Sequence, residues 1–105
     1  MHALIEQHRQ EITELCRRHG VRRLEVFGSA ARGADFDPRT SDVDFLVSFD
    51  KPTGAGWFKR DLDLAEALRA LLGRPVDLVS RAAVESSRNY IRRRGILAEA
   101  QVLYG

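Results

Sequence analysis

The sequence FGSAARGADFDPRTSDVDFLV, residues 27–47, decides the fold of this chain. It connects two apolar segments, residues 21–27 and 42–49, each of which has the length and the alternating side chains of a β-strand. Between them, residues 28–33 are mostly small and predict a tight turn into a short helix, with Ser29 able to cap its N-terminus. The stretch therefore predicts two strands connected by a turn, a short helix and a loop.

Segments outside this stretch predict further helices and one more strand. We expect helices over residues 3–19, 57–72 and 81–100, a loop over 34–41, a turn over 50–54 and a strand over 75–79. The last of these helices is expected to break near Gly95, and residues 102–104 either extend back to the sheet or pack against it. In the helix over 57–72 the predicted buried residues are Leu62, Leu64, Ala65, Leu68, Leu71 and Leu72. This order predicts an α/β (α+β) fold, a small mixed three-stranded sheet with helices packed on one side of it.

The length and composition place the chain among small folded proteins. Its 105 residues predict a single domain over 1–105, and 44% hydrophobic with 30% charged residues argue against disorder. One cysteine, Cys16, cannot form an internal disulfide and is expected to be buried, which fits a reducing cytoplasm. Neither a signal peptide nor a membrane-spanning run is visible, so we expect a soluble cytoplasmic protein without a membrane partner.

The net charge of +2 is too small to indicate nucleic-acid binding, and no direct binding of nucleic acid is expected. The arginines nevertheless gather in two groups. These groups are Arg17, Arg18, Arg22 and Arg23, and then Arg88, Arg92, Arg93 and Arg94. Each is either a solvated face that complements a helix C-terminus or a basic surface for an acidic partner or a phosphate.

Three aspartates are candidates for metal chemistry. Asp42 and Asp44 stand at positions i and i+2 of a predicted strand, so their carboxylates share one face, with Cα atoms ~7 Å apart. Mg²⁺ takes oxygen ligands and is commonly held by one or two carboxylates together with substrate phosphates. Asp77 lies between apolar neighbours in the third predicted strand, where a buried carboxylate is costly without a cation. If that strand lies beside the second, Asp77 can join the pair and accept a proton from an attacking hydroxyl; otherwise it is an ordinary exposed aspartate.

The small-residue turn is a candidate phosphate contact. Gly28 lets the backbone approach a ligand closely, and Ser29 offers a hydroxyl and an N–H group at a helix start. Arg32, one turn later, either reaches a triphosphate or is a solvated charge. Ser41, just before the aspartate pair, either caps the loop or lends its hydroxyl to the site.

The motifs FGSAARG (27–33), SDVDFLV (41–47) and PVDLVS (75–80) resemble the signature of the DNA polymerase β-like nucleotidyltransferase superfamily. The short chain and its ending, IRRRGILAEAQVLYG (91–105), are most similar to the minimal nucleotidyltransferases, the MntA-like antitoxins of MntA–HepT pairs. The spacing from the Gly-Ser turn to the aspartate pair is longer than the commonest family pattern. We expect the extra length, around residues 35–39, to bulge outward and leave the site intact.

The resemblance implies the polymerase β-like nucleotidyltransferase fold and metal-dependent transfer of AMP from ATP. Asp42, Asp44 and Asp77 would be the catalytic and metal-binding residues, with Mg²⁺, a pair of ions, as cofactor. The nucleotide would be bound by Gly28, Ser29, Arg32 and Ser41. The implied acceptor is a tyrosine hydroxyl of a cognate HEPN-domain RNase toxin (HepT-like), silenced by AMPylation in a type VII-like toxin–antitoxin pair, in which the two proteins can form a hetero-oligomer.

Two other functions stay open at this point. A catalytically silent antitoxin would neutralise its toxin by direct binding. A small-molecule nucleotidyltransferase would use the same site on another acceptor, although such relatives usually carry an acceptor-binding domain for which this chain has no room.

Overall fold

The computed structural model describes residues 1–34, 36–37, 39–50 and 54–105, together with their side chains except those of residues 54–58. The predicted turn over 50–54 and the centre of the predicted loop over 34–41 therefore lie partly outside the described residues. The outward bulge expected around residues 35–39 falls in the same region.

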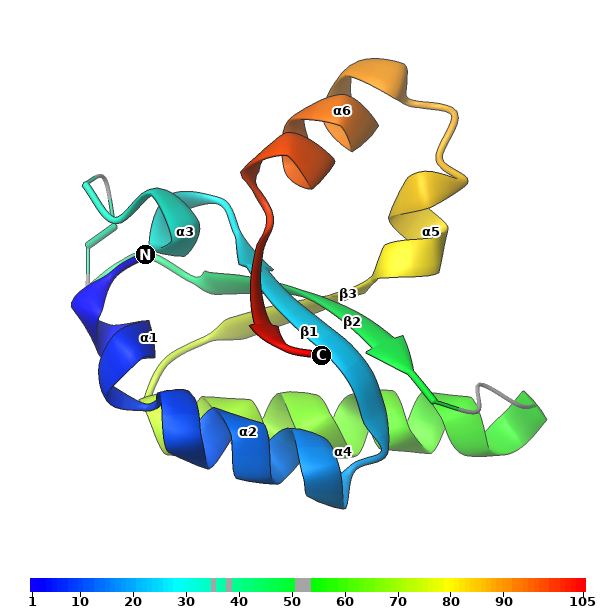
Figure 1. Ribbon diagram of the computed structural model, residues 1–105, viewed down its shortest axis with the longest axis horizontal. Coiled ribbons are helices and arrows are strands. Elements are labelled where there is room, and N and C mark those ends of the chain that lie inside the picture. The colour runs from blue at the N-terminus through cyan, green and yellow to red at the C-terminus, as the bar shows by residue number, and fades with distance from the viewer. Residues whose placement is uncertain (35, 38, 51–53) are drawn as a thin grey trace.

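The strands form one mixed sheet in the order β3-β2-β1-β4 (Figure 1). Their bounds are Val21–Phe27 (β1), Val43–Phe49 (β2), Val76–Ser80 (β3) and Gln101–Tyr104 (β4). β1 runs antiparallel to both of its neighbours, whereas β2 and β3 are parallel. The α/β class and the mixed sheet are confirmed. The sheet has one strand more than the three predicted because β4 pairs with β1, so of the two possibilities left open for residues 102–104 the extension back to the sheet is confirmed. A four-residue strand is too short for its side-chain alternation to be decisive in the sequence.

Two of the predicted helices are each broken into two, whereas the helix predicted over 57–72 begins earlier, at Gly54. The helices of the described part are α1 (Ala3–Gln7), α2 (Arg9–Arg18), α3 (Ser29–Arg32), α4 (Gly54–Leu72), α5 (Arg81–Glu85) and α6 (Tyr90–Glu99). The helix predicted over 3–19 is interrupted at His8, whose ring Nδ1 lies 2.8 Å from the Leu4 carbonyl oxygen. The helix predicted over 81–100 breaks between Glu85 and Tyr90 rather than near Gly95, because Asn89 caps a new helix by accepting from the Arg92 N–H at 3.1 Å.

Helices cover both faces of the sheet, contrary to the one-sided packing predicted (Figure 1). The larger core lies between the sheet and the helices α1, α2 and α4. A smaller cluster on the opposite face joins Phe27, Leu46 and Val84, with residues of α6 packed against it. This second face is apolar because β1 and β2 carry large side chains on both of their faces, a pattern that the one-sided prediction overlooked.

The burial of side chains corrects the prediction for Leu62 and confirms the prediction for Cys16. Leu62 is 47% exposed although it was predicted to face the core, because Leu64 and Leu68 occupy the buried stripe of α4. Cys16 is buried as predicted, and desolvation raises the pKa of its thiol to about 12, so the thiol stays protonated and unreactive. None of the helices in the described residues is long and apolar enough to cross a membrane.

Candidate active site

The parallel pairing of β2 with β3 places two of the three predicted aspartates side by side. Asp44 and Asp77 are direct partners in the register of the two strands, so their Cα atoms are ~4.8 Å apart in the hydrogen-bonding direction. Asp44 shares a face of β2 with Leu46, and Asp77 shares a face of β3 with Val79. Because Leu46 and Val79 belong to the smaller cluster, both carboxylates lie on the sheet face that also carries α5 and α6.

The third aspartate, Asp42, lies just outside the sheet. β2 begins at Val43 rather than at residue 42, and the Val43 N–H donates to the Pro75 carbonyl at 3.1 Å. This bond fastens the segment that carries Asp42 to the segment that precedes Asp77. Both Asp42 and Asp77 are exposed, so the reason first given for Asp77, a buried carboxylate in need of a cation, was wrong.

Asp44 is the aspartate of this group whose pKa is clearly shifted by its surroundings. Its pKa is raised to about 6, first by desolvation and then by the negative charges of Asp77 and Asp42, while the positive charge of Arg32 opposes the shift. The negative charges of Asp77 and Asp42 therefore add to the effect of burial in disfavouring ionisation of Asp44. A cation near Asp44 would offset these charges and favour the ionised carboxylate.

The carboxylate oxygens of Asp42, Asp44 and Asp77 fit a divalent cation that takes its other ligands from outside the protein. Over the described ranges no three Asp, Glu, His or Cys side chains are gathered closely enough to enclose a metal ion. Carboxylate oxygens at the start of β2 and β3 nevertheless suit Mg²⁺, which keeps waters and substrate phosphates among its ligands. The residues present therefore fit a divalent cation that takes its remaining ligands from water or from a phosphate.

The turn after β1 approaches Asp44 so closely that only glycine fits. Gly28 has a φ of 71°, and a Cβ atom at this position would lie 2.6 Å from Asp44 Oδ2. Gly28 is the N-cap of α3, which corrects the expectation that Ser29 caps the helix; Ser29 is its first residue. With only four residues, α3 has a small dipole, so backbone N–H groups of the turn are its main attraction for a phosphate.

Arg32, at the end of α3, interacts with the carboxylates of Glu99 and Asp44. Its Nη1 donates to Glu99 Oε1 at 2.7 Å, and its charge also acts on Asp44. Glu99 is absent from the sequence-based candidates. The two residues are 67 positions apart, and no local pattern indicates the contact.

Ser41 lies in the loop that leads to the aspartates and acts there as a cap. Its hydroxyl accepts from the Asp37 N–H at 3.0 Å, and its carbonyl accepts from Arg74 at 3.3 Å. Of the two roles left open by the sequence, these contacts favour the capping role. Ser41 thereby helps to set the position of Asp42, its neighbour in the chain.

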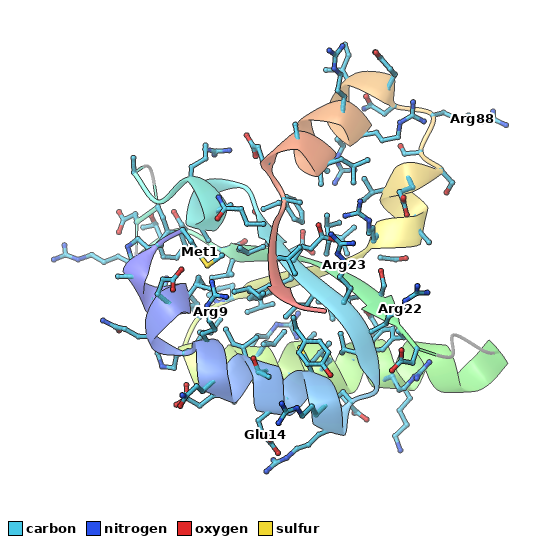
Figure 2. All side chains as sticks on the ribbon, viewed as in Figure 1. Met1, Arg9, Glu14, Arg22, Arg23 and Arg88 are labelled. Carbon is cyan, nitrogen blue, oxygen red and sulfur yellow. The ribbon has the colours of Figure 1, made fainter. Side chains whose placement is uncertain are left out.

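The arginine groups lie mainly at the surface. Arg17 and Arg18 are exposed and lie 3.9 and 3.7 Å from the carboxylate of Glu14. Of the two interpretations of this group, these contacts favour a solvated face over a basic surface for a partner. Arg88 extends away from the protein body at the turn between α5 and α6, while Arg22 and Arg23 project from β1 (Figure 2). Neither group contributes a described contact to the aspartates.

A four-stranded mixed sheet with a Gly-Ser turn beside two aspartates defines a nucleotidyltransferase, and comparison with known families agrees. The family model called nucleotidyltransferase domain matches residues 8–100. The chain therefore belongs to the nucleotidyltransferase domain family, and the predicted class of enzyme, a nucleotidyltransferase, is confirmed.

Similar proteins place the chain near the minimal, MntA-like members, as predicted. It is 39% identical over 84 residues to the protein adenylyltransferase MntA of Thermococcus cleftensis, covering 80% of this chain and 77% of that protein. A solved structure described as a minimal nucleotidyltransferase is 35% identical, with a TM-score of 0.70 over 92% of this chain and 90% of the other. A chain of the complex between the tri-AMPylated HEPN toxin of Shewanella oneidensis and its MNT antitoxin shares the fold, with a TM-score of 0.62, 20% identity and coverage of 95% and 71%.

Proposed function

We propose that this protein is a Mg²⁺-dependent protein adenylyltransferase that transfers AMP from ATP to a tyrosine hydroxyl of a HEPN-domain toxin. The observation that carries the proposal is the register of Asp44 with Asp77 beside a turn that only glycine can form. In this role the protein is the antitoxin of a toxin–antitoxin pair and assembles with its toxin. Residues 1–105 would act as one minimal nucleotidyltransferase domain, and the buried free thiol of Cys16 fits a reducing cytoplasm.

The names of similar proteins support a protein, rather than a small molecule, as the acceptor of AMP. The Thermococcus relative is named a protein adenylyltransferase, and the Shewanella complex contains an AMPylated HEPN toxin. Another solved neighbour, with a TM-score of 0.66 and 22% identity, is a toxin–antitoxin complex with the ATP analogue AMP-PNP. We extend protein AMPylation and the HEPN partner from these proteins to this chain.

Each residue of the site has a role in the proposed reaction. Gly28 and Ser29 bind the triphosphate through the backbone of the turn, and Arg32 binds it through its guanidinium group. Asp42, Asp44 and Asp77 would hold Mg²⁺, which supplies charge neutralisation for the phosphates when it is bound. Ser41 keeps the segment before Asp42 in place.

The transfer is an in-line displacement at the α-phosphorus. The acceptor oxygen forms a bond to that phosphorus while the bond from it to the bridging oxygen of the pyrophosphate breaks, and pyrophosphate leaves with the electron pair. The hydroxyl proton passes to the carboxylate of Asp77, which is exposed and therefore open to an acceptor from outside the molecule.

The test combines the protein with a HEPN-domain protein, if its genomic neighbour encodes one, together with radiolabelled ATP and magnesium. We expect label on a tyrosine of the partner, and we expect the double variant Asp42→Asn/Asp44→Asn to reduce labelling below detection. Asp63→Asn is the matched control, because Asp63 is an exposed aspartate of α4, on the opposite side of the sheet.

Other outcomes would point to the other functions. Labelling that persists in the double variant would remove the aspartates from the reaction. Neutralisation of the toxin without label would identify a silent antitoxin, and label on a small molecule alone would identify a different acceptor class.

A further inference from the structure

The short helix α3 is held in place by segments from both ends of the chain. A helix of four residues is not stable by itself, because it forms too few internal hydrogen bonds for its nucleation cost. The Ala30 carbonyl accepts from the His2 N–H at 2.8 Å, and the Ala31 carbonyl accepts from Gln101 Nε2 at 3.1 Å. The position of α3 therefore depends on residues far away in the sequence.

The junction between α6 and β4 makes a second contact to the same helix through Arg32. Glu99, the last residue of α6, accepts a hydrogen bond from Arg32 Nη1 at 2.7 Å, and Gln101 begins β4 just beyond it. In Figure 1 the α6–β4 segment descends beside α3 before it joins the edge of the sheet as β4. One junction thus contacts both the backbone and the terminal guanidinium group of α3.

Holding Arg32 has a consequence for ligand binding. An arginine side chain that is free to rotate loses conformational entropy when it binds a phosphate, and a side chain already oriented by a partner loses less. The guanidinium group has five N–H donors in a rigid planar arrangement, and Glu99 accepts a hydrogen bond from one of its terminal nitrogens, Nη1. Arg32 lies near the candidate site because α3 begins at the Gly28 turn beside Asp44, and the Arg32 N–H donates to the Gly28 carbonyl at 3.2 Å.

From this geometry we infer that Glu99 is a positioning residue, which holds the Arg32 guanidinium in the orientation that binds the triphosphate of ATP. The inference rests on the proposed function and adds to it a residue that does not itself touch the nucleotide. It also assigns a role to the ion pair between Arg32 and Glu99, whose side chains are 45% and 39% exposed. An exposed pair of this kind contributes little to stability, so loss of Glu99 should leave the fold intact.

The test is a double-mutant cycle on binding of AMP-PNP with magnesium, measured by calorimetry. We expect Glu99→Ala to weaken binding by ~3- to 10-fold and Arg32→Ala by ~10-fold or more. In the Arg32→Ala background, Glu99→Ala should have no further effect, because Glu99 acts through Arg32. In the transfer reaction, Glu99→Ala should raise KM for ATP by the same factor and leave kcat within about twofold.

Glu14→Ala is the control variant. Glu14 lies on α2, on the opposite side of the sheet from α6, and it also pairs with arginines (Figure 2). Its loss should change neither AMP-PNP affinity nor KM, and both variants should unfold at the wild-type temperature.

The results separate this inference from the proposed function. Unchanged or tighter AMP-PNP binding by Glu99→Ala, equal weakening in both backgrounds, or a fall in kcat at constant KM would each overturn the positioning role. Failure of the wild-type protein to bind AMP-PNP would instead overturn the proposed function, and the role of Glu99 with it.

Discussion

At the scale of single residues, Gly28 connects the sequence motif to the chemistry of the site. Its backbone conformation, φ 71° and ψ −150°, disfavours any side chain by about 1–3 kcal/mol, and a Cβ atom would meet Asp44 Oδ2 at 2.6 Å. We therefore expect Gly28→Ala to lower the free energy of unfolding by about that amount and to displace the Asp44 carboxylate. AMP-PNP affinity measured with magnesium should fall by ~10-fold or more, since the turn and the carboxylate are both disturbed.

Gly95 provides the matched glycine control. It lies inside α6, and a Cβ atom there would have no neighbour within 4 Å. Gly95→Ala should therefore stabilise the protein by up to about 1 kcal/mol and leave nucleotide binding unchanged. Wild-type affinity in Gly28→Ala would show that the turn does not contact the triphosphate.

Asp44 makes stability depend on pH in a defined direction. Because its pKa is raised in the folded state to about 6, folding favours the protonated form, and the folded protein loses stability as pH rises from about 4 to 6. Asp44→Asn should remove this loss and stabilise the ligand-free protein at pH 7. A shift of this size corresponds to about 3 kcal/mol, and the half-exposed position of Asp44 reduces the expected gain to about 1 kcal/mol.

Urea unfolding at a series of pH values measures this effect. The stability difference between Asp44→Asn and the wild-type protein should disappear below about pH 4, where the carboxyl is protonated in both the folded and the unfolded state. A difference that stayed constant from pH 3 to pH 8 would contradict the electrostatic origin.

At the scale of secondary-structure elements, an ion pair fastens α5 to the sheet. Glu25 of β1 is 3% exposed and is the one buried charged residue of the described chain. Arg81, the first residue of α5, donates to its carboxylate, and Arg23 lies 3.5 Å from the same oxygen. The pair holds the α5–α6 segment over the face that carries Asp44 and Asp77.

Loss of Arg81 should be costly, because it leaves a buried carboxylate with one weaker partner. We expect Arg81→Ala to lower the free energy of unfolding by about 2–4 kcal/mol. Glu85→Ala is the control, since Glu85 is exposed and lies 3.8 Å from Arg81; its effect should stay below about 1 kcal/mol. Chemical denaturation of both variants measures the difference, and equal stabilities would argue against a structural role for the buried pair.

At the scale of the whole molecule, the site is assembled from segments that are distant in the sequence. The Gly28 turn, the start of β2, the start of β3 and the end of α6 meet on one side of the sheet. Each segment is placed by strand pairing or by packing, and none by its immediate neighbours alone. If the proposed function holds, changes outside the motifs, such as the one proposed at Glu99, should therefore alter nucleotide binding.

Local patterns in the sequence sufficed for the three central strands and for the main candidate residues. The bounds of β1 were predicted without error, and β2 and β3 were each predicted to within one residue, because their apolar runs end at turn-forming residues. The Gly-Ser turn and the Asp-x-Asp pair were visible for the same reason, since their spacing is itself local. Family membership followed from these motifs.

The sequence by itself therefore determined the strands β1, β2 and β3, the class of protein and the candidate carboxylates. Only the tertiary structure decided that β4 joins the sheet, that helices cover both faces, that Asp77 is exposed beside Asp44, and that Glu99 holds Arg32. The physical reason is the separation in sequence of the residues that interact. Helix and strand patterns depend on residues a few positions apart, whereas strand order, burial and long-range ion pairs depend on how the whole chain packs.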